Sequence, residues 1–97
     1  MKIKIEDVVK WAKPHPVGGG KQTRIKSKNY TISIVGGRQG LYGDFENDFE
    51  LAIFDGKNNF VTKYFKQSSD DVLAYLPAEE VEEIVDMVVG ESDFQVL

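Results

Sequence analysis

The chain has 97 residues, of which 41% are hydrophobic and 29% are charged, and this composition is typical of one folded domain and not of a disordered chain. It contains no cysteine, which excludes a disulfide framework, a cysteine-based zinc site and a cysteine nucleophile. No apolar run approaches the roughly 18 residues of a membrane span, and the amphipathic N-terminus lacks the pattern of a signal peptide. We therefore expect a single domain over residues 1–97, cytoplasmic and with no membrane partner.

The net charge of −4 conceals two halves of opposite sign. Residues 1–40 hold nine basic residues against two acids, whereas residues 41–97 hold three lysines against fourteen acids. Such halves attract each other within one fold, or they present a basic face to an anionic partner and an acidic face to a basic one.

The first predicted element is a helix over residues 5–12. Its apolar stripe at helical spacing consists of Ile5, Val8, Val9 and Ala12. Acids in its first turn and lysines in its last match the helix dipole, and Pro14 stops it. A rival interpretation makes residues 2–5 a short strand. Residues 14–20, with two prolines and three glycines, are predicted to be a loop.

The middle of the chain is predicted to be antiparallel β-structure. Alternation of apolar and polar residues predicts a strand from residue 30 to 34 that ends at Gly36. Residues 23–26 are either its partner across a turn or the start of one bulged strand. A second hairpin is expected, with a turn near Gly56 between residues 49–53 and a return strand at 60–65. A two-residue turn would set the register by these pairs: Ile53 with Phe60, Leu51 with Thr62, and Phe49 with Tyr64.

The C-terminal third is predicted to be helical. A polar stretch with serine caps leads into a short helical turn that ends near Tyr75. Pro77 then begins a helix that Gly90 ends, and its stripe consists of Val81, Ile84, Val85 and Val88. Residues 91–97 form either a last strand or a frayed end. The expected fold is α+β: an antiparallel β-meander of three to five strands, covered on one face by the N-terminal and C-terminal helices.

Four glycines lie between residues 36 and 43. A dinucleotide loop requires a helix directly after its glycines, but a strand is predicted here. A phosphate loop at Gly18-Gly19-Gly20-Lys21 also fails, because the glycine spacing, the Ser or Thr after the lysine and the following helix are all missing. Both kinds of nucleotide site are therefore excluded. Two interpretations remain. One is a long connection between strands in which glycine supplies positive φ angles, and the other is a backbone anion site aided by Arg38. We favour the connection.

An acidic run follows the glycines, and it consists of Asp44, Glu46, Asp48 and Glu50. In an extended chain these side chains project on one face, about 6–7 Å apart, while Phe45, Phe49 and Leu51 point to the other. Carboxylates at this spacing could bind a hard cation, but the calcium-loop pattern is absent. We favour a solvated strand face that resists edge pairing or meets a basic partner, and we predict no metal site and no cofactor.

No catalytic residue is predicted, because the single histidine, His15, has no second histidine or cysteine to work with. A basic strand is expected from Lys21, Arg24, Lys26 and Lys28. It could bind a small anion or nucleic acid, although the isoelectric point of 4.9 argues against a general nucleic-acid binder. A free strand edge at residues 23–28 or in the C-terminal tail would also permit a homodimer.

The segment from Tyr30 to Phe65 resembles small uncharacterised bacteriophage proteins. The resemblance lies in Ile34-Val35-Gly36-Gly37, Tyr42-Gly43-Asp44, Phe49-Glu50-Leu51-Ala52-Ile53, and Asp55-Gly56 with Phe60-Val61-Thr62. It covers about a third of the chain and brings no catalytic residue with it. It implies a protein that binds a host protein and blocks it.

We therefore predict a non-enzymatic protein-interaction module, such as a phage-encoded inhibitor or accessory factor that acts on a host protein in the host cytoplasm. Its predicted binding residues are Arg38, Tyr42, Asp44, Glu46, Asp48 and Glu50. The alternative is a binder of a small anion or nucleic acid through the basic N-terminal half and the glycine-rich loop.

Overall fold

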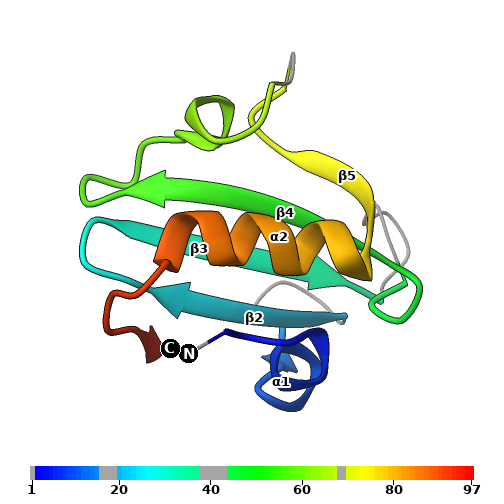
Figure 1. Cartoon of the computed structure of the whole chain (residues 1–97). Helices are drawn as coiled ribbons and strands as arrows, with labels where there is room; N and C mark the ends of the chain where they lie inside the picture. The colour runs from blue at the N-terminus through cyan, green and yellow to red at the C-terminus, as the bar shows by residue number, and fades with distance from the viewer. Residues whose placement is uncertain (1, 16–19, 38–43, 68–69) are drawn as a thin grey trace.

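The computed structural model describes residues 2–15, 20–37, 44–67 and 70–97. An antiparallel sheet runs through it in the order β1-β2-β3-β4-β5, and β6 pairs with β2 beside β1 (Figure 1). The elements are α1 (Ile5–Lys10), β1 (Lys13–Pro14), β2 (Lys21–Lys26), β3 (Tyr30–Gly36), β4 (Asp48–Asp55), a 3-10 helix (Thr62–Tyr64), β5 (Leu73–Pro77), α2 (Ala78–Val89) and β6 (Gln95–Val96). An α+β fold with an antiparallel meander is thus confirmed.

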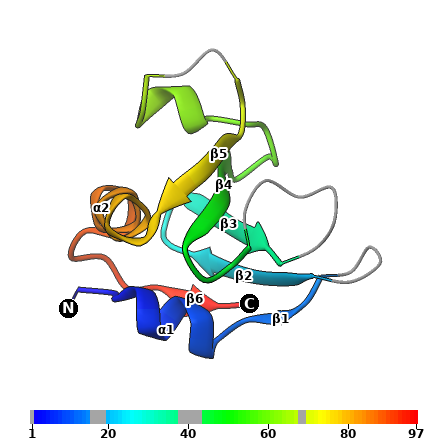
Figure 2. The same cartoon turned by 90° about the vertical axis from the view of Figure 1, so that its right-hand side faces the viewer.

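The core lies on one face of the sheet, where apolar side chains form rows across the strands. Ile25 lies opposite Ile32, and Ile32 lies opposite Ile53, and none of the three is exposed to solvent. The helix α2 packs on this face against β4 and β5 (Figure 2). Its buried side chains are Val81, Ile84, Val85 and Val89. The predicted stripe of this helix is therefore confirmed in the main, as is its end at Gly90, which has a φ of 57°.

The short helix α1 lies at the β2 side of the sheet (Figure 2). The buried Thr23 hydroxyl of β2 donates to the Val8 carbonyl at 2.7 Å, and the Ile5 N–H donates to the Glu82 carboxylate of α2 at 2.7 Å. These two bonds tie α1 to both the sheet and α2. That both helices cover one face of the sheet stays a prediction.

The apolar stripe predicted for the first helix is wrong in part. The helix ends at Lys10; Val8 is buried, but Val9 is 41% exposed. Ile3, which precedes the helix, fills the core instead. A helix of less than two turns presents few residues to one neighbour, so the chain before it supplies the remaining contact. The rival strand over residues 2–5 is also wrong, because residues 2–4 are irregular and Ile5 begins the helix.

The predicted return strand over residues 60–65 is wrong, and so is its register. Phe60 alone bridges to β4, opposite Phe54, and the chain then turns into the 3-10 helix. The Ile53 N–H donates to the buried Thr62 hydroxyl, and this hydroxyl donates to the Asp71 carbonyl. One threonine side chain thus satisfies a backbone donor of β4 that a strand partner would otherwise satisfy.

The place of the return strand is taken by β5, where a helical turn was predicted. Leu76 lies opposite Phe49 and Leu73 lies opposite Leu51, with a register shift between the two pairs. These leucines are buried, so the requirement to cover β4 decides the conformation of this segment.

The sequence left two strands undecided, and the structure contains both. Residues 21–26 pair with β3 through a turn in which the Ser27 N–H donates to the Tyr30 carbonyl, and the tail forms β6. The outer edge of β2 is consequently occupied by β1 at one end and by β6 at the other. The free edge that was predicted at residues 23–28 for a homodimer is therefore not free. Within the described ranges, no helix is long and apolar enough to cross a membrane.

Candidate functional site

The predicted acidic row is wrong in its first half, because the strand begins only at Asp48. Asp44 instead anchors a turn. Its carboxylate accepts the backbone N–H groups of Asn47 at 2.7 Å, Glu46 at 2.8 Å and Asp48 at 3.2 Å. These bonds, that from Asn47 first, hold the pKa of the Asp44 carboxyl well below its usual range.

The turn also carries Phe45 into the core. Its φ is 61°, a conformation uncommon for an aromatic residue, and its ring packs edge-on against Phe49 with centroids 5.2 Å apart. Asp44 and Glu46 are exposed beside it. Asp44 therefore has a structural role in the turn, which the two-residue spacing of the acids in the sequence did not indicate.

A similar turn closes the other end of β4. The Asp55 carboxylate accepts the backbone N–H groups of Lys57 at 2.8 Å and Asn59 at 2.9 Å. The bond from Asn59, followed by that from Lys57, lowers the pKa of Asp55. An aspartate thus anchors the turn at each end of β4.

The predicted basic strand is divided between the two faces of the sheet. All four of its residues are exposed: Lys21, Arg24, Lys26 and Lys28. Because side chains alternate along β2, Arg24 and Lys26 lie on the face away from the core, whereas Lys21 lies on the other. Lys28 lies in the turn after β2. Arg38 and Tyr42, two of the predicted binding residues, lie outside the described residues.

The sheet face away from α2 contains a hollow of about 190 Å³. Its walls come from Ser33 and Val35 of β3 and from Glu50, Ala52 and Phe54 of β4, with His15, Gln22, Phe60 and Val72 around them. The small side chain of Ala52 leaves the space between Glu50 and Phe54. The ring centroids of Phe54 and Phe60 lie 4.6 Å apart, and this aromatic pair closes one end of the hollow. The hollow therefore has a carboxylate toward one end and an aromatic pair at the other.

A second hollow of about 460 Å³ adjoins the first, since Val72 lines both. It is lined by Asp70, Asp71, Val72, Ala74 and Tyr75. We call the two hollows together the open-face groove. Among the described residues, no lysine or arginine lines it. Lys63 is near, with its Nζ 3.8 Å from the Asp71 carboxylate.

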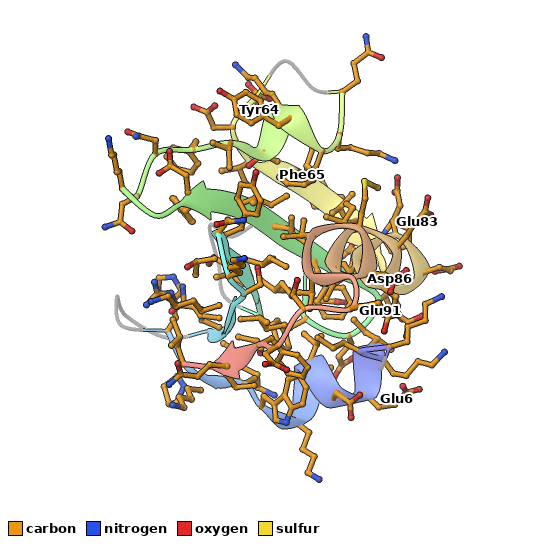
Figure 3. The ribbon with its side chains drawn as sticks, turned by 60° about the vertical axis from the view of Figure 1, so that its left-hand side comes forward. Glu6, Tyr64, Phe65, Glu83, Asp86 and Glu91 are labelled. Atoms are coloured by element: carbon orange, nitrogen blue, oxygen red, sulfur yellow. The ribbon has the colours of Figure 1, made fainter. Side chains whose placement is uncertain are left out.

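Exposed aromatic side chains are found in this groove and on the 3-10 helix. Phe60 is 47% exposed, Tyr75 is 62% exposed, and Tyr64 on the 3-10 helix is 80% exposed (Figure 3). Tyr75 also has a φ of 55° within β5, close to the register shift of that strand. The sequence did not indicate that Phe60, Val72 and Tyr75 line one groove, because they come together only after β5 pairs with β4.

A second surface is the solvent side of α2. Residues 78–89 include five acids and no basic residue, and this composition could have indicated the surface from the sequence. Figure 3 shows Glu83, Asp86 and Glu91 along this helix and its C-terminal end, and Glu6 on α1. Met87, 49% exposed, lies among them. Lys66 pairs with Glu80 at 2.8 Å, and this contact raises the pKa of Lys66.

The hollow beside Ala52 brings together a serine, a histidine and a glutamate, which are residue types used in nucleophilic catalysis. The Ser33 hydroxyl, however, accepts a hydrogen bond from the Gln22 amide at 3.0 Å. This bond uses a lone pair of the serine oxygen and does not place a base at its proton. Among the described residues, no group of three or more histidines, aspartates or glutamates is arranged to hold a metal ion.

Comparisons with known proteins found no match among family models, curated proteins or solved structures.

Proposed function

We propose that this protein is a small non-enzymatic interaction module that binds a basic segment of another protein in its open-face groove. One observation carries the proposal: Glu50, Asp70 and Asp71 line two adjoining hollows whose described lining includes one histidine, His15, but no lysine or arginine. A phage-encoded inhibitor or accessory factor that acts on a host protein would work in this way. The bacteriophage resemblance of residues 30–65 is compatible with that role.

The side chains of the groove suit a protein partner. Tyrosine is enriched among the residues that carry most binding energy at interfaces, and exposed rings such as those of Phe60 and Tyr75 supply apolar contact area. The excess of carboxylates favours lysine and arginine on the partner and speeds encounter with it. The smaller hollow, at about 190 Å³, is below the roughly 300 Å³ at which small-molecule pockets begin, and this supports a side chain as its occupant.

The strand edges are poorer candidates than the groove. β1 and β6 occupy the outer edge of β2. β5 has only five residues, is interrupted at Tyr75, and ends in Pro77, which has no N–H to donate. Short edges with an irregularity and a proline resist the addition of another strand. A partner is therefore expected on the face of the sheet.

Of the predicted binding residues that the structure describes, Glu50 lines the groove. Asp44 and Asp48 bond within the turn, and Glu46 is exposed next to them. Contacts from Arg38 and Tyr42 stay predictions.

The test compares three forms of the tagged chain as bait in a bacterial lysate. They are the wild type, a groove variant with Glu50→Lys and Phe60→Ala, and a control with Glu83→Gln and Asp86→Asn on α2. We expect the wild type and the control to capture the same protein and the groove variant to lose it. Calorimetry with the purified partner should then show at least tenfold weaker binding by the groove variant. Capture that survives in the groove variant but fails in the α2 control would refute the proposal.

A second candidate function is the binding of a small anion or nucleic acid by the basic residues of β2. Arg24 and Lys26 favour it, because both are exposed on the open side of the sheet, with Lys28 in the turn that follows the strand. This function predicts oligonucleotide binding that weakens steeply with salt and is lost in Arg24→Ser with Lys26→Ser. Fluorescence anisotropy with a labelled single strand would measure it.

A further inference from the structure

We infer that the smaller hollow, beside Ala52, is a subsite for one arginine side chain of the partner. This inference rests on the proposed function and names the chemical group that the groove would recognise. It is argued below from the register of β3 and β4, the charge in the hollow and the hydrogen-bonding groups of its wall.

The register of β3 and β4 sets the order of side chains along the hollow, from the carboxylate to the aromatic pair. Glu50, Ala52 and Phe54 alternate with core residues along β4 and so lie on one face, about 13 Å from first to last. Beside them on β3, Val35 is opposite Glu50 and Ser33 is opposite Ala52. A long side chain can thus lie with its methylene groups over Ala52 and Val35 and its charged end at Glu50. The Phe54 and Phe60 rings then contact the group of the partner that lies on the N-terminal side of this arginine.

The charge in the hollow selects a cation. Glu50 is half-buried, so its field is screened less than that of an exposed carboxylate. Asp70 and Asp71 line the adjoining hollow and add further negative charge. Arg24 is on the same face at β2 but does not line the hollow, so among the described residues Glu50 is accompanied there by one histidine, His15, and by no lysine or arginine.

The hydrogen-bonding groups favour arginine over lysine. A guanidinium has five N–H donors in a plane and can bond both oxygens of a carboxylate, whereas an ammonium acts as a point charge. Ser33 and Gln22, joined by their own hydrogen bond, offer further oxygens at the wall next to Glu50. A planar group with several donors can use these acceptors together with the carboxylate.

The probe that tests this inference is benzoyl-arginine amide, which carries an aromatic group and a guanidinium. Its matched control is benzoyl-citrulline amide, which has the same shape but no charge. We expect saturable shifts of backbone amide signals at Ser33, Glu50, Ala52, Phe54 and Phe60 in nuclear magnetic resonance spectra of the labelled chain. The arginine probe should bind at least fivefold more tightly than the citrulline probe.

Three variants separate the parts of the subsite. Glu50→Gln should reduce the preference for arginine over citrulline to about one. Phe60→Ala should weaken both probes by a similar factor, because it removes the aromatic contact but not the charge. Glu83→Gln, on the other side of the sheet, should change neither. Amide spectra without probe establish that each variant is folded.

Equal binding of the two probes by the wild type would overturn the inference, as would shifts that map to α2. The titration needs no partner, so its result is separate from the capture experiment. If groove variants lose a captured partner but the probes show no charge preference, the arginine subsite is wrong and the proposed function stands. If the probes bind as expected but groove variants keep their partner, the proposed function is wrong and the subsite stands.

Discussion

At the scale of single residues, Asp44 and Asp55 make the stability of the turns beside β4 depend on pH. Backbone N–H groups lower the pKa of both carboxyls in the folded chain. Their stabilising effect is therefore complete above the ordinary aspartate pKa of about 3.9 and is lost as pH falls from there toward the folded values. We expect the free energy of unfolding to fall between pH 5 and pH 2, and to fall less in Asp44→Asn or Asp55→Asn. Urea titrations at several pH values measure it, and identical pH slopes would contradict the assignment.

Tyr75 adopts a backbone conformation that costs a non-glycine residue of order 1 kcal/mol or more. We expect Tyr75→Gly to be more stable than Tyr75→Ala by about 1 kcal/mol, because only glycine adopts this φ without strain. Both variants should weaken partner binding, since both lose the exposed ring. Thermal unfolding measures the difference, and an alanine variant as stable as the glycine variant would show that β5 is not strained here.

At the scale of elements, Thr62 joins β4 to the segment that leads into β5. Its hydroxyl accepts from the Ile53 N–H and donates to the Asp71 carbonyl, and its side chain is fully buried. Thr62→Val keeps the shape but leaves both backbone groups unsatisfied, so we expect a loss of about 2 kcal/mol or more. Thr62→Ser keeps the hydroxyl and should lose less.

Thr62 also supports the groove, because Asp71 and the adjacent Val72 line it. Faster amide exchange at residues 70–72 in Thr62→Val would accompany the loss of stability. Unchanged exchange there would show that the threonine does not hold this wall of the groove.

The helix α2 has acids at neighbouring positions on its solvent side, and like charges three or four residues apart repel. Glu83→Lys places a lysine between Glu79 and Asp86. We expect a gain in stability of about 0.5–1 kcal/mol at low salt, and about half of this gain in Glu83→Gln. One molar salt should reduce the difference, because it screens exposed charges. A loss of stability in Glu83→Lys would contradict this account of α2.

At the scale of the whole molecule, β6, near the C-terminus, covers part of the outer edge of β2. It pairs with Ile25 and Lys26, and the Leu97 N–H donates to the Arg24 carbonyl at 2.9 Å. Deletion of residues 95–97 would expose this edge of β2, and exposed edges promote association. We expect the truncated chain to self-associate with increasing concentration, as measured by sedimentation velocity. Val96→Ala, which keeps the backbone, should behave as the wild type does.

Local rules predicted those elements whose neighbours are close in sequence. The alternation that begins at Tyr30 predicts β3, and the spacing of Val81, Ile84 and Val85 with the stop at Gly90 predicts α2. The same rules failed after Asp55. Hydrogen bonds that backbone N–H groups donate to the side chains of Asp55 and Thr62 redirect the chain there, and a favourable strand register cannot reveal them. Of the candidate site, the sequence indicated Glu50 but not its aromatic neighbours.

The sequence by itself determined the fold class, the core faces of β3 and α2, and the concentration of acids in the second half. These properties follow from periodicity and composition, which are local. Only the tertiary structure decided that β5 pairs with β4, that β1 and β6 cover the edge of β2, and that Val72 joins two hollows. The physical reason is that strand partners are selected by the burial of side chains distant in sequence, and a groove exists only between elements that have already paired.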